Sequence, residues 1–337
     1  MKKRGLIKII LYVIPIPILL FSLFIGPSET ASFQAIKNYF LYYISGSNGI
    51  AIQDNAIIQT ILFDVRLPRI ILAFLVGGAL SVSGCGLQAI FRNPLVSPYI
   101  LGLSSGAAFG AALSLAYAFM PVQLSAFLFG LLAVGLSFIA AHKHKKISIV
   151  SLILAGVIVT GIFTALLTLI QFMSDPFKLQ SIVHWTMGNL HNTGWQSLYS
   201  SFIPILIGVF VLLLMRWRLN VLALGDEEAK TSGIHPGREK MIVLIAATLS
   251  SSAAVSVAGI IGLYGLIVPH MIRMMVGPDN KQAIPLNFLF GGTFLLIIDN
   301  FSRTIASFEI PIGVITMLIG APLFLYLIKK TNIGWEN

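Results

Sequence analysis

The sequence predicts an all-α polytopic membrane protein, from its composition and from the length of its apolar runs. Hydrophobic residues make up 57% of the 337 residues and charged residues only 10%. Mean hydropathy is +0.91, whereas about a quarter of the residues in a typical soluble domain are charged. Many apolar runs reach the roughly 20 residues that cross a bilayer as a helix. The lone cysteine, Cys85, excludes an intrachain disulfide and a cysteine metal cluster.

About ten spanning helices are predicted. The first apolar run follows a basic N-terminal stretch, as in a signal peptide, but it is too long and no small-residue cleavage site follows it. It is therefore interpreted as a spanning helix. The eighth run is short and contains Pro269, which kinks or interrupts a helix. The expected spans are residues 6–25, 67–91, 99–119, 122–141, 149–173, 197–215, 241–261, 263–276, 284–305 and 311–328.

The positive charges orient these spans. With an even number of spans both chain ends lie on one side, and a cytoplasmic N-terminus places 17 of the Lys and Arg residues inside and 5 outside. This asymmetry also explains the net charge of +10 without nucleic-acid binding. Residues 26–65 and 174–196 then become long outer loops. The five outer basic residues are Lys37, Arg66, Arg69, Lys178 and Arg303.

Small residues mark tightly packed helices. Gly102, Gly106 and Gly110 recur every four residues, so they are expected on one helix face that admits close backbone approach. The stretches GGALSVSGCG and SSSAAVSVAG, in the second and seventh spans, indicate similar interfaces. Flexible hinges are the alternative interpretation.

The sequence lacks the signature motifs of several transporter and enzyme classes. The sequence has no G-x-x-x-x-G-K-[ST], so ATP is not bound through a P-loop. Ion-coupled transporters usually need carboxylates near the bilayer midplane, and the nearest case, Asp299, lies toward the outer part of the ninth span. His270 has no obvious partner for intramembrane proteolysis and is interpreted as structural or interfacial.

One polar segment interrupts the second half of the chain. LGDEEAKTSGIHPGREK, residues 224–240, holds seven charged side chains between two apolar runs. Gly225 breaks the chain, and the acidic residues after it favour the first turn of a helix. Gly233 suits the position after a helix end, and Pro236 suits the start of the next helix. A short cytoplasmic helix over 226–232 is therefore predicted. A solvated connector is the alternative, but a rigid protruding helix is a good docking element.

Several long motifs resemble the FecCD family of type II ABC importer permeases, which take up iron-siderophores, haem and cobalamin. They cover nearly the whole chain in the family's order. The motifs are RLPRIILAFLVGGALSVSGCGLQAIFRNPLVSPYILGLSSGAAFGA (66–111), WTMGNL (185–190), ALGDEEAKTSGI (223–234) and the stretch 258–325, with GLIVPHMIRMMVGPD and EIPIGVITMLIGAPLFLYL.

The resemblance implies one permease domain over 1–337 that pairs with a second permease subunit, identical or related. It also implies two cytoplasmic ATPase subunits and an extracytoplasmic substrate-binding protein, with no cofactor in this chain because ATP is used by the partner. The polar segment is similar to the family's coupling helices, which dock on the ATPases. Ala229 is expected to be exposed there before assembly. The coupling residues are Gly225, Asp226, Glu227, Glu228, Ala229, Thr231 and Gly233.

The resemblance also implies two gates and a docking surface. The first cytoplasmic gate element is Asn93, Pro94 and Leu95, where an ordinary turn is the alternative. The second is Ser148, Ile149 and Val150, where the family often has more polar residues. Arg66, Arg69 and Arg303 resemble docking sites for glutamates of the binding protein, and lipid headgroup contacts are the alternative.

The predicted function is the permease subunit of an ATP-driven importer in the bacterial cytoplasmic membrane. Its implied cargo is an Fe(III)-siderophore, with haem or cobalamin as alternatives. An ion-coupled secondary transporter and a structural membrane protein are the alternatives from other classes. The coupling segment and the missing midplane carboxylates oppose the former, and the glycine faces and paired gate elements oppose the latter.

Overall fold

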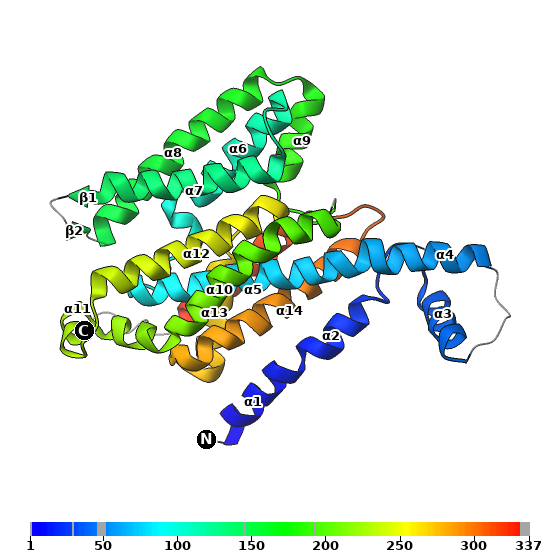
Figure 1. Cartoon of the computed structure of the whole chain (residues 1–337), viewed down its shortest axis with the longest axis horizontal. Coiled ribbons are helices and arrows are strands. Elements are labelled where there is room, and N and C mark those ends of the chain that lie inside the picture. The colour runs from blue at the N-terminus through cyan, green and yellow to red at the C-terminus, as the bar shows by residue number, and fades with distance from the viewer. Residues whose placement is uncertain are drawn as a thin grey trace.

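The computed structural model describes residues 2–28, 30–45, 52–143, 146–147, 149–191 and 193–330. They form helices and one very short hairpin (Figure 1). The elements in chain order are α1 (Lys2–Val13), α2 (Pro15–Ser22), α3 (Phe33–Ser45), α4 (Ile52–Thr60), the π-helix η1 (Ile61–Arg66), α5 (Leu67–Phe91), the 3-10 helix η2 (Pro98–Leu101), α6 (Leu103–Tyr117), α7 (Val122–Ala141), β1 (His142–Lys143), β2 (Lys146–Ile147), α8 (Ile149–Met173), α9 (Pro176–Thr186), α10 (Trp195–Leu224), α11 (Asp226–Thr231), α12 (Pro236–Ala258), α13 (Tyr264–Val276), α14 (Asn280–Thr304) and α15 (Ile312–Lys330).

The helical class of the fold is confirmed. Among the described residues, 7 helical segments are long and apolar enough to cross a membrane, and shorter apolar helices lie at 103–117, 264–276 and 312–326. Each predicted span falls on one of these helices, including the segment with Pro269, which is helical throughout α13. The number of helices that cross the bilayer and the side on which the ends lie remain predictions. In Figure 1, α11 and the β1–β2 hairpin lie at one end and α4 and α9 at the other, as that topology requires.

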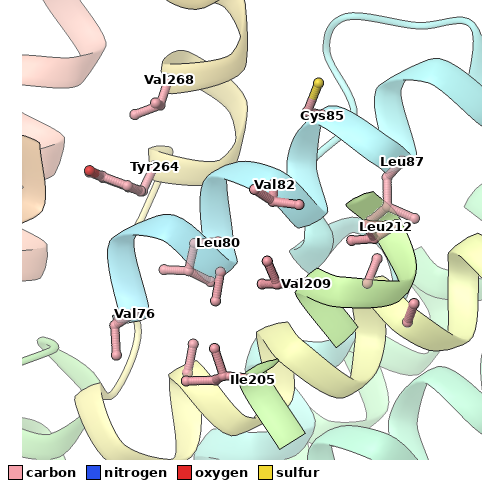
Figure 2. Close-up of a cluster of buried hydrophobic side chains, with 14 of the residues drawn as sticks. Val76, Leu80, Val82, Cys85, Leu87, Ile205, Val209, Leu212, Tyr264 and Val268 are labelled. Atoms are coloured by element: carbon pink, nitrogen blue, oxygen red, sulfur yellow. The ribbon is translucent and has the colours of Figure 1, made fainter. Parts of the chain in front are cut away.

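The central helix is α5, which packs against α10, α12, α13 and α14. Nearly every residue from Pro68 to Phe91 is buried. Figure 2 shows side chains of α5 beside those of α10 in this core, with Val82 near Val209 and Leu87 near Leu212. Because lipid is as apolar as leucine, close packing must hold such a helix in place.

The predicted small-residue interface is confirmed at two of the three glycines, Gly106 and Gly110 of α6. A Cβ added at Gly106 would lie 2.5 Å from the backbone oxygen of Phe129, and one at Gly110 would lie 2.6 Å from that of Ser125, so both glycines bring α6 against α7. Gly102 does not share this face. It lies between η2 and α6 with a φ of 84°, a left-handed conformation that glycine adopts readily.

Residues 26–65 and 174–196, predicted as long outer loops, both contain helices, and their place outside the membrane remains a prediction. α4, η1 and α5 follow without a break, so the helix that contains the second predicted span begins well before residue 67. Ile36 and Tyr39 of α3 pack with Ile58 and Leu62 in a small separate core. Polar residues lie between these apolar positions in the sequence, so their spacing does not indicate a helix clearly. In the second segment, Asp175 caps α9 by accepting bonds from two backbone N–H groups.

Candidate functional site

The polar segment at residues 224–240 forms the predicted short helix. α11 begins after Gly225, whose φ is 152°, and ends in a glycine-based cap. The Ile234 N–H donates to the Ala229 carbonyl at 2.9 Å, and the Gly233 N–H donates to that of Lys230 at 2.9 Å. This pair of bonds is the Schellman arrangement, with Gly233 left-handed at φ 76°. The predicted helix end at Gly233 is therefore confirmed.

The expectation that Ala229 is exposed is wrong. Its side chain is fully buried in the main core, together with Ile234. These two residues occupy the positions between which a hydrophobic contact often accompanies a Schellman cap. The exposed side of α11 consists of Glu227, Glu228, Lys230 and Thr231. A six-residue helix gives too few positions for its buried face to be identified from periodicity.

One ion pair fixes α11 to α12, and a second joins α12 to α10. Asp226 pairs with Lys240 of α12 at 2.5 Å. On the preceding helix, Arg218 pairs with Glu239 at 2.9 Å. A push on α11 would therefore act on α10 and α12 together.

The end of α10 is also tied to α14. Asn220 donates to the Asp279 carboxylate at 2.6 Å and accepts from the Asn280 N–H at 2.7 Å. The hydrogen bond from Asn220 is the main cause that lowers the pKa of Asp279. Asp279 also caps the start of α14.

The first predicted gate element is a tight turn at the end of α5. Arg92 ends the helix in a left-handed conformation with φ 50°. The Asn93 side chain then accepts a bond from the Leu95 N–H at 2.9 Å. Asn93 and Pro94 are half-buried, while the Leu95 side chain is 49% exposed. The turn interpretation is correct for the geometry, and the gate role remains a prediction.

A buried glutamine that the sequence analysis missed supports this turn. Gln88 donates from Nε2 to the carbonyls of Val96 at 3.0 Å and Leu266 at 3.3 Å. Its Oε1 accepts a bond from Arg273 of α13. Gln88 thus links the gate turn to α13. The available signal was one amide side chain inside an otherwise apolar span.

The second gate element is only partly described. Ser148 lies outside the described residues. Ile149 is the first residue of α8, and the Val150 side chain is 66% exposed. α8 packs against η2, a few residues after the Asn93–Leu95 turn, so the two predicted gate elements belong to neighbouring parts of the fold.

The three outer arginines are buried, which corrects the expectation that they face the outer solution or lipid headgroups. Arg66, Arg69 and Arg303 are 3%, 5% and 4% exposed. Arg66 donates to the backbone carbonyls of Leu23 at 2.8 Å and Ala31 at 3.0 Å. Buried charges require such partners. Binding-protein docking through these residues remains a prediction.

Arg69 and Arg303 belong to an ionic cluster at the ends of α5 and α14 that the predicted topology places outside. We call Arg69, Asp299, Arg303, Glu309 and His191 the outer cluster. Arg69 bonds the fully buried Asp299 at 2.8 Å and Glu309 at 2.9 Å. The Nε of Arg303 lies 3.2 Å from Asp299, although its angle makes no hydrogen bond.

The outermost members of the cluster are Glu309 and His191. The Nδ1 of His191 lies 3.1 Å from Glu309 Oε2. Burial of Glu309 opposes ionisation, but its bonds with Arg69 and His191 outweigh that effect and lower its pKa below the ordinary 4.5. The Glu309 carboxylate is therefore charged at neutral pH.

An open cleft of about 520 Å³ lies at the same end of the molecule, between α7, α9 and α12. Its lining is rich in amide and hydroxyl side chains, and His184 is its only ionisable residue among those described. Its lining residues come from separate segments of the chain, so the sequence alone does not bring them together. The cleft residues are Leu115, Val122, Gln123, Gln180, Ser181, His184, Trp185, Asn189, Thr193, Ser256 and Val257.

Comparison with known proteins supports the family resemblance. The FecCD transport family matches residues 12–330. The molybdate import system permease protein MolB of Haemophilus influenzae is 41% identical over 290 residues, which cover 85% of this chain and 86% of MolB. An iron chelatin transport system permease protein of Helicobacter pylori is 37% identical over 88% of each chain. Other relatives are named for cobalamin, hemin and iron(3+)-hydroxamate import.

The fold is also shared with a solved structure. A metal-chelate type ABC transporter in an inward-facing conformation matches with a TM-score of 0.85 and 37% identity, over 97% of this chain and 100% of the other. Sequence and fold therefore agree over nearly the whole length. The chain belongs to the FecCD transport family and is a multi-pass ABC importer permease.

Proposed function

We propose that this permease carries an Fe(III)-siderophore across the bacterial cytoplasmic membrane. It would work as one of two paired permease subunits, with two ATPase subunits on the cytoplasmic side and a substrate-binding protein outside. The observation that carries the ATP-driven mechanism is α11, a short helix that follows α10 after one residue, has an exposed polar side and is paired with α12 through Asp226 and Lys240.

Iron-siderophore cargo is supported by the relatives named for iron chelatin and iron(3+)-hydroxamate transport. Molybdate is a second candidate, because the relative with 41% identity is a molybdate permease. Haem and cobalamin are further alternatives, each with a relative of that name. These cargoes differ greatly in size and charge, so a direct identification separates them.

The cargo is best identified on the binding protein that co-purifies with the assembled transporter. We expect mass spectrometry to find an iron chelate on it after growth in iron-limited medium, and less of it after growth in iron-rich medium. Molybdate, haem or cobalamin as the bound ligand would contradict the siderophore proposal. Uptake that persists without ATP, and stops when the ion gradient collapses, would instead support a secondary transporter.

If α11 couples the permease to the ATPase, a substitution on its exposed side should weaken ATPase docking without destabilising the permease. Thr231 is exposed on α11 and its hydroxyl bonds only the Glu228 carbonyl of the same helix, at 2.9 Å. Thr231→Trp should therefore leave the melting temperature of the purified permease nearly unchanged, as surface substitutions usually do. A bulky ring should prevent the ATPase from seating, which we expect to weaken its binding at least about tenfold, or roughly 1.4 kcal/mol.

Two variants control this experiment. Thr231→Ser keeps the hydroxyl and should dock normally. Ala229→Glu places a carboxylate in a fully buried position and should lower the melting temperature, so it would test folding rather than coupling. Normal ATPase binding and uptake by Thr231→Trp would exclude the exposed side of α11 from the ATPase contact.

A further inference from the structure

The two carboxylates of the outer cluster, Glu309 and Asp299, differ in their position and in their exposure to solvent. Glu309 lies between α14 and α15, outside the helices, and its side chain is 25% exposed. Asp299 lies within α14 and its side chain is 0% exposed. Arg69, with a side chain 7% exposed, lies between them. Glu309 therefore covers the side of the Arg69 guanidinium that faces the outer solution.

The contact between Glu309 and Arg69 is a two-pronged one. Nη1 of Arg69 donates to Oε1 at 2.9 Å, and Nη2 donates to Oε2 at 3.0 Å. Paired parallel bonds of this kind are the geometry in which arginine recognises a carboxylate. Any glutamate or aspartate that reached this position could form the same two bonds.

Among the described contacts, those of Arg66 and Arg303 include no partly exposed side chain that another carboxylate could replace. Arg66 uses two of its nitrogens on backbone carbonyls, which cannot leave without unfolding the segment. Arg303 bonds the side chain of Asn300 and the carbonyl of Ile25, and its Nε faces the buried Asp299. Arg69 is the one outer arginine whose bonded partner is a partly exposed side chain.

We propose that Glu309 occupies the binding position on Arg69 that an acidic side chain of the extracytoplasmic partner protein takes when that protein docks. When that protein docks, its carboxylate would replace Glu309 on Arg69, and Glu309 would swing toward the outer solution. This inference rests on the proposed importer function, because it requires an extracytoplasmic partner.

Charge balance favours exchange over simple addition. Two arginines and two carboxylates make the cluster neutral apart from His191. An exchange keeps this balance and keeps Arg69 paired. It avoids leaving a charge buried without a partner, which is strongly unfavourable.

The backbone beside Glu309 is fixed, so the side chain would move alone. Ile310 donates from its N–H to the Ser302 carbonyl at 3.2 Å and accepts from the Ser302 hydroxyl at 2.5 Å. His191, with a side chain 55% exposed, lies against Glu309 on the solvent side. A thiol at position 191 would therefore report on the charge next to it.

The first test measures access to Arg69 without any partner protein. In a Cys85→Ala background, His191→Cys is labelled with an anionic and a cationic methanethiosulfonate, with and without Glu309→Gln. Because Glu309→Gln removes the negative charge that offsets Arg69, the ratio of anionic to cationic labelling rates should rise about tenfold or more. An unchanged ratio would overturn the proposal. Asp175→Asn, which removes an exposed outer carboxylate and can keep the α9 cap, should leave the ratio unchanged.

The second test measures docking of the co-purified binding protein to transporter in nanodiscs. Because Glu309→Gln removes the competitor, the proposal predicts binding that is tighter by roughly fivefold to tenfold. Glu309→Asp, which keeps the charge, should bind like the unaltered protein. Equal or weaker binding by Glu309→Gln, with unchanged melting temperature, would overturn the displacement. A binding protein that docks on neither form would instead contradict the proposed importer function, while the labelling ratio would still decide whether Glu309 covers Arg69.

Discussion

Alanine at position 84 is expected to prevent the chain from forming a stable permease. Gly84 lies in the middle of α5, where its Cα faces the backbone of α13. A Cβ added there would overlap the carbonyl oxygen of Gly265 and contact the rest of that peptide group. Backbone cannot move aside as a flexible side chain can.

The sequence of α13 explains why this oxygen lies so close. Pro269 is four residues after Gly265 and has no N–H, so the Gly265 carbonyl loses its usual partner within the helix. The oxygen is then directed at the one position of α5 without a side chain. Gly84 and Pro269 thus form one packing arrangement between α5 and α13. Figure 2 labels the neighbouring side chains Val82 and Cys85 of α5 and Tyr264 and Val268 of α13.

The expected cost of Gly84→Ala is about 3 kcal/mol or more, the upper part of the range for overpacked cores. We expect loss of the monodisperse peak in size-exclusion chromatography, or a much lower melting temperature in dodecyl maltoside. Gly161→Ala is the matched control, since it is also a glycine within a long helix but has nothing within 4 Å of the added Cβ. If both variants have the same melting temperature as the unaltered protein, α5 and α13 do not cross as closely as described.

Features encoded over short stretches of sequence could be predicted. The apolar runs gave the spans because a bilayer fixes the length of a helix. α11 could be located because glycines and acidic residues mark both of its ends within ten residues. Its buried face could not, because one turn and a half contains no repeat that would distinguish Ala229 from its neighbours.

Features that depend on distant partners could not be predicted. Arg66 and Arg69 are three residues apart and were expected on one surface, yet they bind different segments. The carboxylates that bind Arg69 are 230 and 240 residues away in the sequence. Similarly, α3 became recognisable as a helix only through its packing on Ile58 and Leu62. A single sequence gives no indication of such pairings.

Replacing Asp299 with asparagine should destabilise the permease strongly. Asp299 is fully buried and receives bonds from Nε and Nη2 of Arg69, at 3.1 and 2.8 Å. It also lies 3.2 Å from the Nε of Arg303. Without this carboxylate, two buried guanidinium groups would share only Glu309. Breaking a buried ion pair in this way costs about 3–5 kcal/mol, which should appear as a large fall in the melting temperature.

A second substitution separates the charge effect from loss of packing. Adding Arg303→Gln to Asp299→Asn leaves one arginine, Arg69, paired with one carboxylate, Glu309, so the cluster is balanced again. The double variant should therefore lose less stability than the sum of the two single variants, with a coupling of roughly 1–3 kcal/mol. The melting temperatures of all four proteins, compared in one detergent, give this coupling. Strictly additive losses would mean that Asp299 does not act by neutralising the two arginines. In that case the buried arginines would have to be stabilised by their backbone and amide partners.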